Sequence, residues 1–291
     1  MIAGIEAGGT KFVLAVGPSP TQIAAKDSIP TRTPEETLAE AAAWFERHGR
    51  IDALGIASFG PVQLDTSSSD WGKITNTPKL GWAGCDLAGY FANRLSVPVG
   101  FDTDVNGAAL AESAFGVGVD RSSLAYLTVG TGIGGGLVIE GKAVHGSAHP
   151  EMGHIFPRRH SRDAEFAGIC PVHGDCLEGL ASGPAVLARW GVELSELPHD
   201  HEGHEIIADY LGQLCHNLFA MTAVEAVAIG GGVLKTEGLL KRVRRAAQRL
   251  DAGYLPGKSR QVVVAPGLGD EAGIKGALFL AERAMKAPSE M

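Results

Sequence analysis

Two stretches with the same construction decide the fold of this chain: Ile2-Ala-Gly-Ile-Glu-Ala-Gly-Gly-Thr-Lys-Phe-Val-Leu-Ala-Val16 and Leu124-Ala-Tyr-Leu-Thr-Val-Gly-Thr-Gly-Ile-Gly-Gly-Gly-Leu-Val-Ile-Glu140. In each, an apolar run leads into a glycine-rich turn and a second apolar run follows. This is the pattern of a β-hairpin, and in the first stretch the turn is expected to need positive φ. The repetition predicts a duplicated α/β architecture, with two similar halves hinged across a cleft.

Strands and helices are expected to alternate in both halves. Thr33-Pro34-Glu35-Glu36 combines an N-cap, a proline at the first helical position and a glutamate three residues after the cap, so a helix should begin there. Its buried stripe would be Leu38, Ala41, Ala42 and Phe45. The other expected strands are 22–28, 51–57, 97–102, 226–229 and 262–265, and the other expected helices are 86–95, 205–222, about 238–250 and one from about residue 272.

The composition is that of a globular α/β protein. The chain has 291 residues, 45% of them apolar, and 40 glycines, which suggests two domains with many tight turns, with a single large α/β unit as the alternative. Its net charge of -8 disfavours nucleic acid and anionic lipid as partners. The N-terminus has no basic leader region, and no apolar run approaches the ~20 residues that cross a bilayer. We therefore expect a cytoplasmic protein.

The glycine loops are candidate phosphate sites. Glycines let backbone N–H groups converge on a phosphate, and Lys11 adds a positive charge beside Gly8-Gly9. A plain hairpin turn would explain one such loop, but further loops at 130–136 and 230–232 favour a nucleotide. The segment 130–135 also matches the dinucleotide-binding fingerprint. A strand rather than a helix is expected to follow it, so that match is accidental.

The segment Asp102-Thr103-Asp104-Val105-Asn106 lies at the end of an expected strand and enters a helix. Carboxylates at this position face the ligand site in open α/β sheets. Asp104 could accept the proton of a substrate hydroxyl, while Asp102 could be structural. Asp104 could equally be a helix N-cap, and the spacing leaves the two alternatives balanced.

A third motif has the spacing of a metal site. Cys170-Pro-Val-His173-Gly-Asp-Cys176 places two thiolates and an imidazole on a tight loop, and His154 is the natural fourth donor for tetrahedral zinc. The alternative is two ordinary cysteines that flank an exposed histidine. The histidines of 199–204 are better explained by a polar loop before the helix at 205–222. Cys85 and Cys215 are isolated and expected to be small buried residues rather than a disulfide pair.

Taken in order, these motifs resemble those of the ROK family of sugar kinases, and the resemblance spans nearly the whole chain. The motifs are Glu6-Ala-Gly-Gly-Thr-Lys11, Gly130-Thr-Gly-Ile-Gly-Gly-Gly136, Glu151-Met-Gly-His154 and the cysteine loop with Glu178. The resemblance implies a duplicated hexokinase/actin-like (ribonuclease H-like) two-domain α/β fold with an interdomain cleft. The small lobe would be 1–115 joined by a C-terminal helix 273–291, and the large lobe with the zinc-binding loop would be 116–272.

The resemblance also implies an activity and its residues. The family transfers the γ-phosphoryl group of ATP to a hexose hydroxyl, with Asp104 as general base and Mg²⁺ neutralising the phosphates. The implied substrate-binding residues are Asn76, Thr103, Asn106, Glu151, His154 and Glu178. The implied ATP-binding residues are Gly8, Gly9, Thr10, Lys11, Thr131, Gly132, Gly230, Gly231 and Gly232. The implied ligands of a structural Zn²⁺ are His154, Cys170, His173 and Cys176, and His154 would bind the sugar through its other ring nitrogen.

Several details look most like the bacterial fructokinases of this family. These are Glu6 in the first hairpin, the segment Asn76-Thr-Pro-Lys-Leu-Gly-Trp82, and His173 where the glucokinases tend to have a third cysteine. Thr103 also replaces the asparagine that the glucokinases tend to have before the catalytic aspartate. We therefore expect fructose to be converted to fructose 6-phosphate. The family resemblance also implies a homodimer.

Three alternatives compete with this expectation, and two of them stay open. One is a kinase of the same family that acts on mannose, glucose or an N-acetylhexosamine, and another is a sugar-sensing protein without catalysis. The third is a repressor of the same fold, but repressors carry a helix-turn-helix ahead of the first hairpin, which here begins at Ile2. A DNA-binding role is therefore not expected.

Overall fold

The computed structural model describes residues 1–286 and divides into two compact units. Unit 1 consists of Met1–Phe115, Ala143–His149 and the C-terminal segment that begins at Asp270. Unit 2 consists of Gly116–Lys142 and Pro150–Gly269. Part of the expected C-terminal helix, residues 287–291, lies outside the described residues.

Unit 1 contains a five-stranded sheet in the order β3-β2-β1-β4-β5. Strand β1 pairs antiparallel with β2, which pairs antiparallel with β3, while β1, β4 and β5 run parallel. The strands are β1 (Ile2–Ala7), β2 (Lys11–Gly17), β3 (Ala25–Pro30), β4 (Ala53–Ser58) and β5 (Val99–Thr103). The helices are α1 (Pro34–Arg47), α2 (Leu87–Leu95), α3 (Asp104–Phe115) and α8 (Ala272–Lys286).

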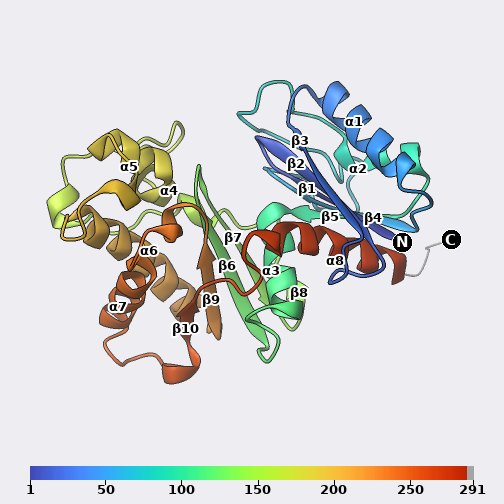
Figure 1. Ribbon diagram of the computed structural model, residues 1–291. Helices are drawn as coiled ribbons and strands as arrows, with labels where there is room; N and C mark the ends of the chain where they lie inside the picture. The colour runs from blue at the N-terminus through green and yellow to red at the C-terminus, as the bar shows by residue number, and fades with distance from the viewer. Residues whose placement is uncertain (287–291) are drawn as a thin grey trace. The chain divides into compact units, whose positions relative to one another are not determined.

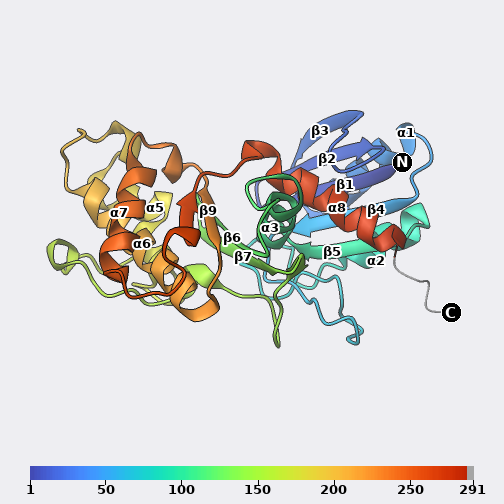
Figure 2. The same cartoon turned by 90° about the horizontal axis from the view of Figure 1, so that it is seen from below.

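Helices cover both faces of the unit 1 sheet (Figure 1). On one face, α1 and α2 enclose an apolar core with Phe12, Phe45, Phe91 and Trp82 as its large members. On the other face, α8 crosses the parallel strands and packs along α3, as seen from below in Figure 2. Helix α1 begins as predicted, because Thr33 and Glu36 form a reciprocal capping box with a proline in the first turn.

Small residues allow α8 to approach the sheet closely. A Cβ at Gly55 in β4 would collide with the backbone of Ala277, and a Cβ at Gly100 in β5 would collide with the carbonyl of Leu280. Gly107 of α3 and Gly276 of α8 meet backbone to backbone in the same way. Glycines on this face of the sheet and on α3 therefore make the close approach of α8 possible.

Unit 2 contains a second five-stranded sheet in the order β10-β9-β6-β7-β8. Strand β6 pairs antiparallel with β7 and parallel with β9, which pairs parallel with β10. The strands are β6 (Ser123–Val129), β7 (Ile133–Ile139), β8 (Lys142–Ala143), β9 (Ala226–Gly230) and β10 (Val262–Val264). The helices are α4 (Leu177–Ala181), α5 (Gly183–Trp190), α6 (Gly203–Thr222) and α7 (Leu239–Asp251), of which α6 and α7 lie side by side (Figure 2).

The two sheets have the same topology, because each places its first strand between an antiparallel hairpin partner and a parallel neighbour. The predicted duplication is confirmed at this level.

The predicted turn geometry is wrong, since neither Gly8 nor Gly9 has a positive φ. In the second hairpin the turn is shorter than predicted, because β7 begins at Ile133 and its glycines lie in the strand. No helix follows that turn, so the dinucleotide fingerprint is accidental as predicted.

One segment does not belong where the sequence places it. Residues 143–149 were expected in the large lobe, but they pack with unit 1. The reason is local: Nε2 of His145 lies 3.1 Å from Oδ2 of Asp102, and Nε2 of His149 accepts the N–H of Val62 at 3.2 Å. Within residues 1–286, no helix combines the length and apolar character needed to cross a membrane.

Candidate active site

The junction of β5 and α3 carries the candidate general base. Thr103 supplies the cap, since its Oγ1 accepts the N–H of Asn106 at 3.1 Å. Asp104 is the first residue of α3, and its Oδ1 accepts the N–H of Val105 at 2.9 Å. Thr103, rather than Asp104, therefore makes the N-cap hydrogen bond of α3, to the N–H of Asn106. The half-buried Asp104 carboxylate lies at the positive end of the helix dipole.

Asp102 is held entirely differently from Asp104. It is buried, and its Oδ1 accepts the N–H of Thr103 at 2.8 Å and the side-chain amide of Asn106 at 2.7 Å. His145 adds a third donor. A carboxylate engaged by so many protein donors fits the structural role that the sequence suggested for it.

The first glycine turn is a tight connection between β1 and β2. The N–H of Gly8 donates to the carbonyl of Lys11 at 2.9 Å, and the hydroxyl of Thr31 donates to the carbonyl of Gly8 at 2.7 Å. A Cβ at Gly8 would lie 2.9 Å from the Lys11 oxygen, whereas Gly9 faces open space. Gly9, Thr10 and Lys11 are exposed, so their backbone and the lysine ammonium are accessible to a ligand.

Glu6 lies just before this turn, and a Cβ on Gly273 at the start of α8 would meet its carboxylate. Burial raises the pKa of Glu6, against the opposing effects of Lys11 and Lys26. Asn76, the other candidate of unit 1, is exposed on a long loop between β4 and α2. That loop is tied down nearby, where Nζ of Lys79 donates to the carbonyl of Thr31 at 3.3 Å.

Unit 2 contains a pocket of about 470 Å³ beside the second glycine turn. Two of the predicted ATP-binding residues, Thr131 and Gly232, line it. Gly130 of the predicted glycine loop also lines it, and the walls not predicted from the sequence are Gly183, Pro184, Val186, Leu187, Glu193, Leu194, Ser195, Val233 and Thr236. No local motif marks 183–195 as ligand-binding, and only the Ser182-Gly183-Pro184 helix start could have drawn attention to it. The pocket has the size and the mixed apolar and polar lining of a nucleoside site.

The other predicted ATP-binding residues of unit 2, Gly132, Gly230 and Gly231, are not among the residues that line this pocket. Gly231 has a φ of +96°, and a Cβ there would collide with the backbone of Val129. Gly230 packs against Pro266. Gly132 leaves room for Glu178, whose Oε2 accepts the N–H of Ile133 at 2.9 Å. Glu178 therefore lies against the glycine turn, with one oxygen committed to the backbone.

The predicted metal ligands come together in unit 2. One donor atom from each of His154, Cys170, His173 and Cys176 lies within 4.8 Å of all the others. Nδ1 of His154 is 3.9 Å from Sγ of Cys170 and 3.5 Å from Sγ of Cys176, and Nδ1 of His173 is 3.8 Å from Sγ of Cys170. Tetrahedral zinc with ordinary Zn–S and Zn–N bonds requires S···N separations of about 3.6 Å. The residues present therefore fit a zinc ion.

The short helix Met152–His154 brings His154 to this cluster. Gly153 is required there, because a Cβ would collide with the carbonyl of Ile133. Since His154 turns Nδ1 towards the thiols, Nε2 is the nitrogen left for a second ligand. Glu151 precedes the helix and is exposed. Burial raises the pKa of the Cys176 thiol to about 11, and a bound cation would reverse that effect by favouring the thiolate.

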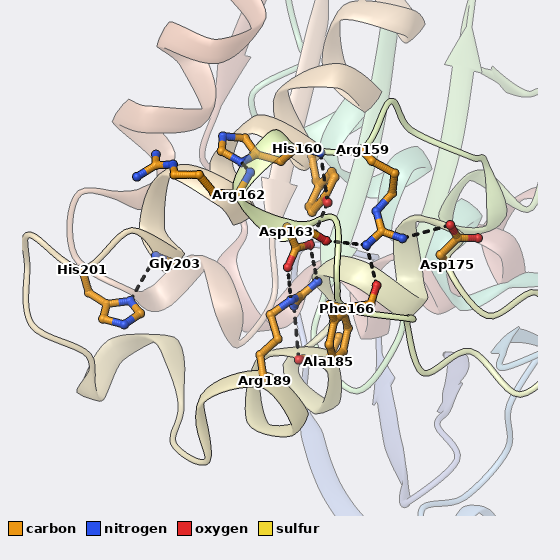
Figure 3. Close-up of polar contacts among 11 residues, drawn as sticks. Arg159, His160, Arg162, Asp163, Phe166, Asp175, Ala185, Arg189, His201 and Gly203 are labelled. Carbon is orange, nitrogen blue, oxygen red and sulfur yellow. Dashed lines mark hydrogen bonds and ion pairs between the residues drawn. The ribbon is translucent and has the colours of Figure 1, made fainter.

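A buried ionic network holds the chain between these ligands (Figure 3). Asp163 pairs with Arg189 of α5 through two contacts, Nε to Oδ1 at 2.8 Å and Nη2 to Oδ2 at 3.0 Å. The hydroxyl of Tyr210 donates to the same carboxylate at 2.7 Å. Arg159 donates to the carbonyls of Asp163 and Phe166 and pairs with Asp175 inside the cysteine loop. The network thus fixes the segment between His154 and Cys170 to the helices of unit 2.

The histidines of 199–204 make local contacts instead. Nδ1 of His201 accepts the N–H of Gly203 at 3.1 Å (Figure 3), and Nε2 of His204 lies 3.0 Å from the carbonyl of Pro198. They form the polar loop before α6, as predicted. Within the described residues, the only group with metal-site geometry is the cluster of His154, Cys170, His173 and Cys176.

Comparison with known proteins decides the family, since the model of the ROK family matches residues 2–284. The chain belongs to the ROK family. It is 47% identical over 285 residues to the fructokinase of Zymomonas mobilis, covering 95% of each chain. It is 41% identical to a putative fructokinase of Bacillus subtilis, covering 99% of this chain and 97% of that protein.

The fold agrees with that of solved ROK kinases. The ROK glucokinase of Streptomyces griseus, in complex with glucose and AMPPNP, superposes with a TM-score of 0.74 at 25% identity, covering 97% of this chain and 99% of that one. The chain therefore has the duplicated hexokinase/actin-like α/β fold of the ROK family, and the resemblance stated from the sequence is confirmed.

Proposed function

We infer that this ROK protein is an ATP-dependent fructokinase, a transferase that converts fructose to fructose 6-phosphate. The observation that carries this inference is the relationship to fructokinases over almost the whole length of the chain. The exposed glycine turn with Lys11 and the nucleoside-sized pocket of unit 2 support the nucleotide half of the reaction. Mannose, glucose and an N-acetylhexosamine are the alternative acceptors.

Asp104 is the general base of this proposal. Its carboxylate takes the proton of the sugar C6 hydroxyl, whose oxygen forms a bond to the γ-phosphorus while the bond to the β,γ-bridging oxygen breaks and ADP leaves. The position at the start of α3 supports this role, because the positive end of the helix dipole attracts a negatively charged carboxylate. Mg²⁺ would supply charge neutralisation for the ATP phosphates.

The other site residues take the roles that the family resemblance implies. Asn76, Thr103, Asn106, Glu151, His154 and Glu178 would bind the sugar. Gly8, Gly9, Thr10, Lys11, Thr131, Gly132, Gly230, Gly231 and Gly232 would bind ATP. The pocket in unit 2 supports adding Gly183, Pro184, Glu193 and Ser195 to the nucleotide site.

Zinc is proposed as an architectural ion bound by His154, Cys170, His173 and Cys176. Its ligand geometry supports this assignment. Zinc would fix the loop that leads to Glu178, so its loss should displace the sugar-binding residues rather than remove a Lewis acid. We also propose a homodimer and a cytoplasmic location, on the family resemblance alone.

A substrate panel tests the proposed function. Initial rates with ATP should give the highest kcat/KM for fructose, slower turnover of mannose, and little or none of glucose and N-acetylmannosamine. If another sugar gave a higher kcat/KM than fructose, that sugar would be assigned as the substrate instead. Sugar binding without phosphorylation of any acceptor would favour a sensor and overturn the enzymatic assignment.

Replacement of the base tests the mechanism. Asp104→Asn should lower kcat by about 10²–10⁴-fold while changing sugar affinity little, because only the proton acceptor is lost. Asp27→Asn is the matched control, since Asp27 is exposed on β3 and its carboxylate accepts the N–H of the adjacent Ser28. Turnover of the Asp104→Asn enzyme within a few-fold of the unmodified enzyme would exclude this base.

A further inference from the structure

Segment 143–149 reaches unit 1 through two histidines with different partners. His149 accepts a backbone N–H from Val62, whereas His145 contacts the side chains of Asp102 and Asn106 beside the candidate base. His145 belongs to no motif of the sequence and to none of the roles assigned above. Its contacts lie at the N-terminus of α3, the helix whose first residue is Asp104.

The hydrogen-bond geometry fixes which ring nitrogen of His145 carries a proton. Nε2 lies 3.3 Å and 3.1 Å from the two oxygens of Asp102, and this carboxylate also accepts hydrogen bonds from Thr103 and Asn106. A bare nitrogen lone pair at those distances would be repelled, so Nε2 bears a hydrogen. The Asn106 amide nitrogen lies 3.2 Å from Nε2 of His145. Both atoms are then donors, and they share Oδ1 of Asp102 as acceptor.

This arrangement also determines the orientation of Asn106. The side chain is 1% exposed, and its Nδ2 must face Asp102, because the reversed amide would place its oxygen against the carboxylate. Oδ1 is then a buried acceptor without a protein partner within the described residues. A buried acceptor that is held unpaired, two residues from Asp104, is placed to receive a hydrogen bond from a ligand.

We propose that His145 is a positioning residue of the fructokinase reaction, which pairs with Asp102 and thereby fixes the Asn106 amide and the first turn of α3 that presents Asp104. The expected effect on kcat rests on the proposed function, whereas the pair between His145 and Asp102 does not. Asp102 is the link, because it accepts from Thr103, Asn106 and His145 together.

The charges around this pair define its pH dependence. The hydrogen bond to Asp102 raises the pKa of His145, and the partial burial of the ring opposes that effect less strongly. Arg283 of α8 also acts on Asp102, and Glu282 acts on Arg283 in turn. Asp102 therefore keeps one cation nearby when His145 loses its proton, and neutral His145 still donates through Nε2. Deprotonation should weaken the positioning rather than abolish it.

Kinetics of three variants test the proposal. His145→Ala removes the donor and should lower kcat for fructose about tenfold, with KM changed less than threefold, because a loosely held base reaches its productive position less often. His145→Gln keeps an amide donor without the charge, so its kcat should match that of the unmodified enzyme at alkaline pH and exceed that of His145→Ala. The unmodified enzyme should lose kcat severalfold as pH rises through the pKa of His145, and His145→Gln should lack this loss.

His149→Ala is the matched control for loosening of the segment, since the His149 ring accepts the N–H of Val62. It should keep the alkaline loss at the same pH. A His145→Ala enzyme with unchanged kcat, a His145→Gln enzyme no better than His145→Ala, or an alkaline loss that survives in His145→Gln would each overturn the proposal.

An NMR titration tests the pair without reference to activity. The His145 imidazole resonance, identified by its absence in His145→Gln, should titrate above the ordinary histidine range, and Asp102→Asn should lower its pKa. Equal values in the two proteins would refute the pair. If the pKa of His145 is raised but the protein phosphorylates no sugar, the pair is present and the proposed function is wrong.

Discussion

At the scale of single residues, the carboxylate of Asp163 holds a guanidinium inside unit 2. The side chains of Asp163 and Arg189 are 3% and 5% exposed, and Arg189 also stacks on the ring of Phe166 at 3.8 Å. Breaking a buried pair leaves an uncompensated charge. Asp163→Asn, which is nearly isosteric, should therefore lower the free energy of unfolding by about 3–5 kcal/mol, measured by denaturant titration.

Glu202→Gln is the matched control for this prediction. Its partner Arg162 lies 3.3 Å away in the same unit, but both side chains are about half exposed. The free energy of unfolding should change by less than about 1 kcal/mol, because water already solvates both charges. Equal effects of the two substitutions would show that burial of the Asp163 pair has no energetic consequence.

How far individual residues could be predicted depended on how local their signal is. Cys170, His173 and Cys176 stand within one tight loop, so their spacing alone indicated a metal site. His145 and Glu193 carry no such pattern. Their contacts join segments that are distant in sequence, and only the folded backbone brings them to Asp102 and to the pocket.

At the scale of secondary-structure elements, the contact between β4 and α8 has no room for a side chain. Gly55→Ala would place a methyl group on the backbone of Ala277. Because the helix backbone cannot rotate away as a side chain would, the substitution should cost about 2 kcal/mol or more in the free energy of unfolding. Thermal unfolding should show a lower Tm.

Gly146→Ala is the control for the glycine substitution. Gly146 has open space within 4 Å of a new Cβ, and its φ is not positive. The Tm should change little. A Gly55→Ala protein as stable as Gly146→Ala would mean that α8 can shift on the sheet without cost.

Elements with strong local signals were predictable, and those held by tertiary contacts were not. Helix α1 has its capping box and apolar stripe, and it was found where expected. Helices α4 and α5 were missed, because they are only 5 and 8 residues long and show too few turns for a periodic pattern. The hairpin glycines were interpreted as turn residues, although Gly135 lies in β7 and makes room for Met152 and Leu127.

At the scale of the whole molecule, the metal cluster belongs to one unit. If zinc is bound as proposed, the protein should contain about one zinc per chain. Its removal by a chelator should raise amide hydrogen exchange in residues 152–182 while leaving β1 and β4 of unit 1 unchanged, because the ligands cross-link only loops of unit 2. Mass spectrometry of exchanged peptides would measure both.

Cys170→Ser should reproduce the zinc loss and the local exchange without chelator. Cys85→Ser is the matched control, because this half-buried cysteine lies in unit 1 outside the cluster. It should retain the metal. Absence of zinc from the freshly purified unmodified protein would rule out the site, and uniform exchange throughout the chain would rule out a local role.

The duplicated topology was predictable because both hairpins are written in the sequence with the same order of apolar run, glycines and apolar run. The assignment of 143–149 to unit 1 was not. It depends on two histidine rings that bond to Asp102 and Val62, and a scan along the chain shows only a polar stretch there.

The place of α8 in unit 1 bears on how the protein is made. Strands β1, β4 and β5 leave the ribosome early, but the helix that covers them is the last described segment to emerge. Unit 2 is therefore complete in the nascent polypeptide while the amino-terminal sheet still exposes the glycine-lined surface awaiting its cover. The unit whose synthesis begins first therefore receives its last helix only when residues 272–286 have been made.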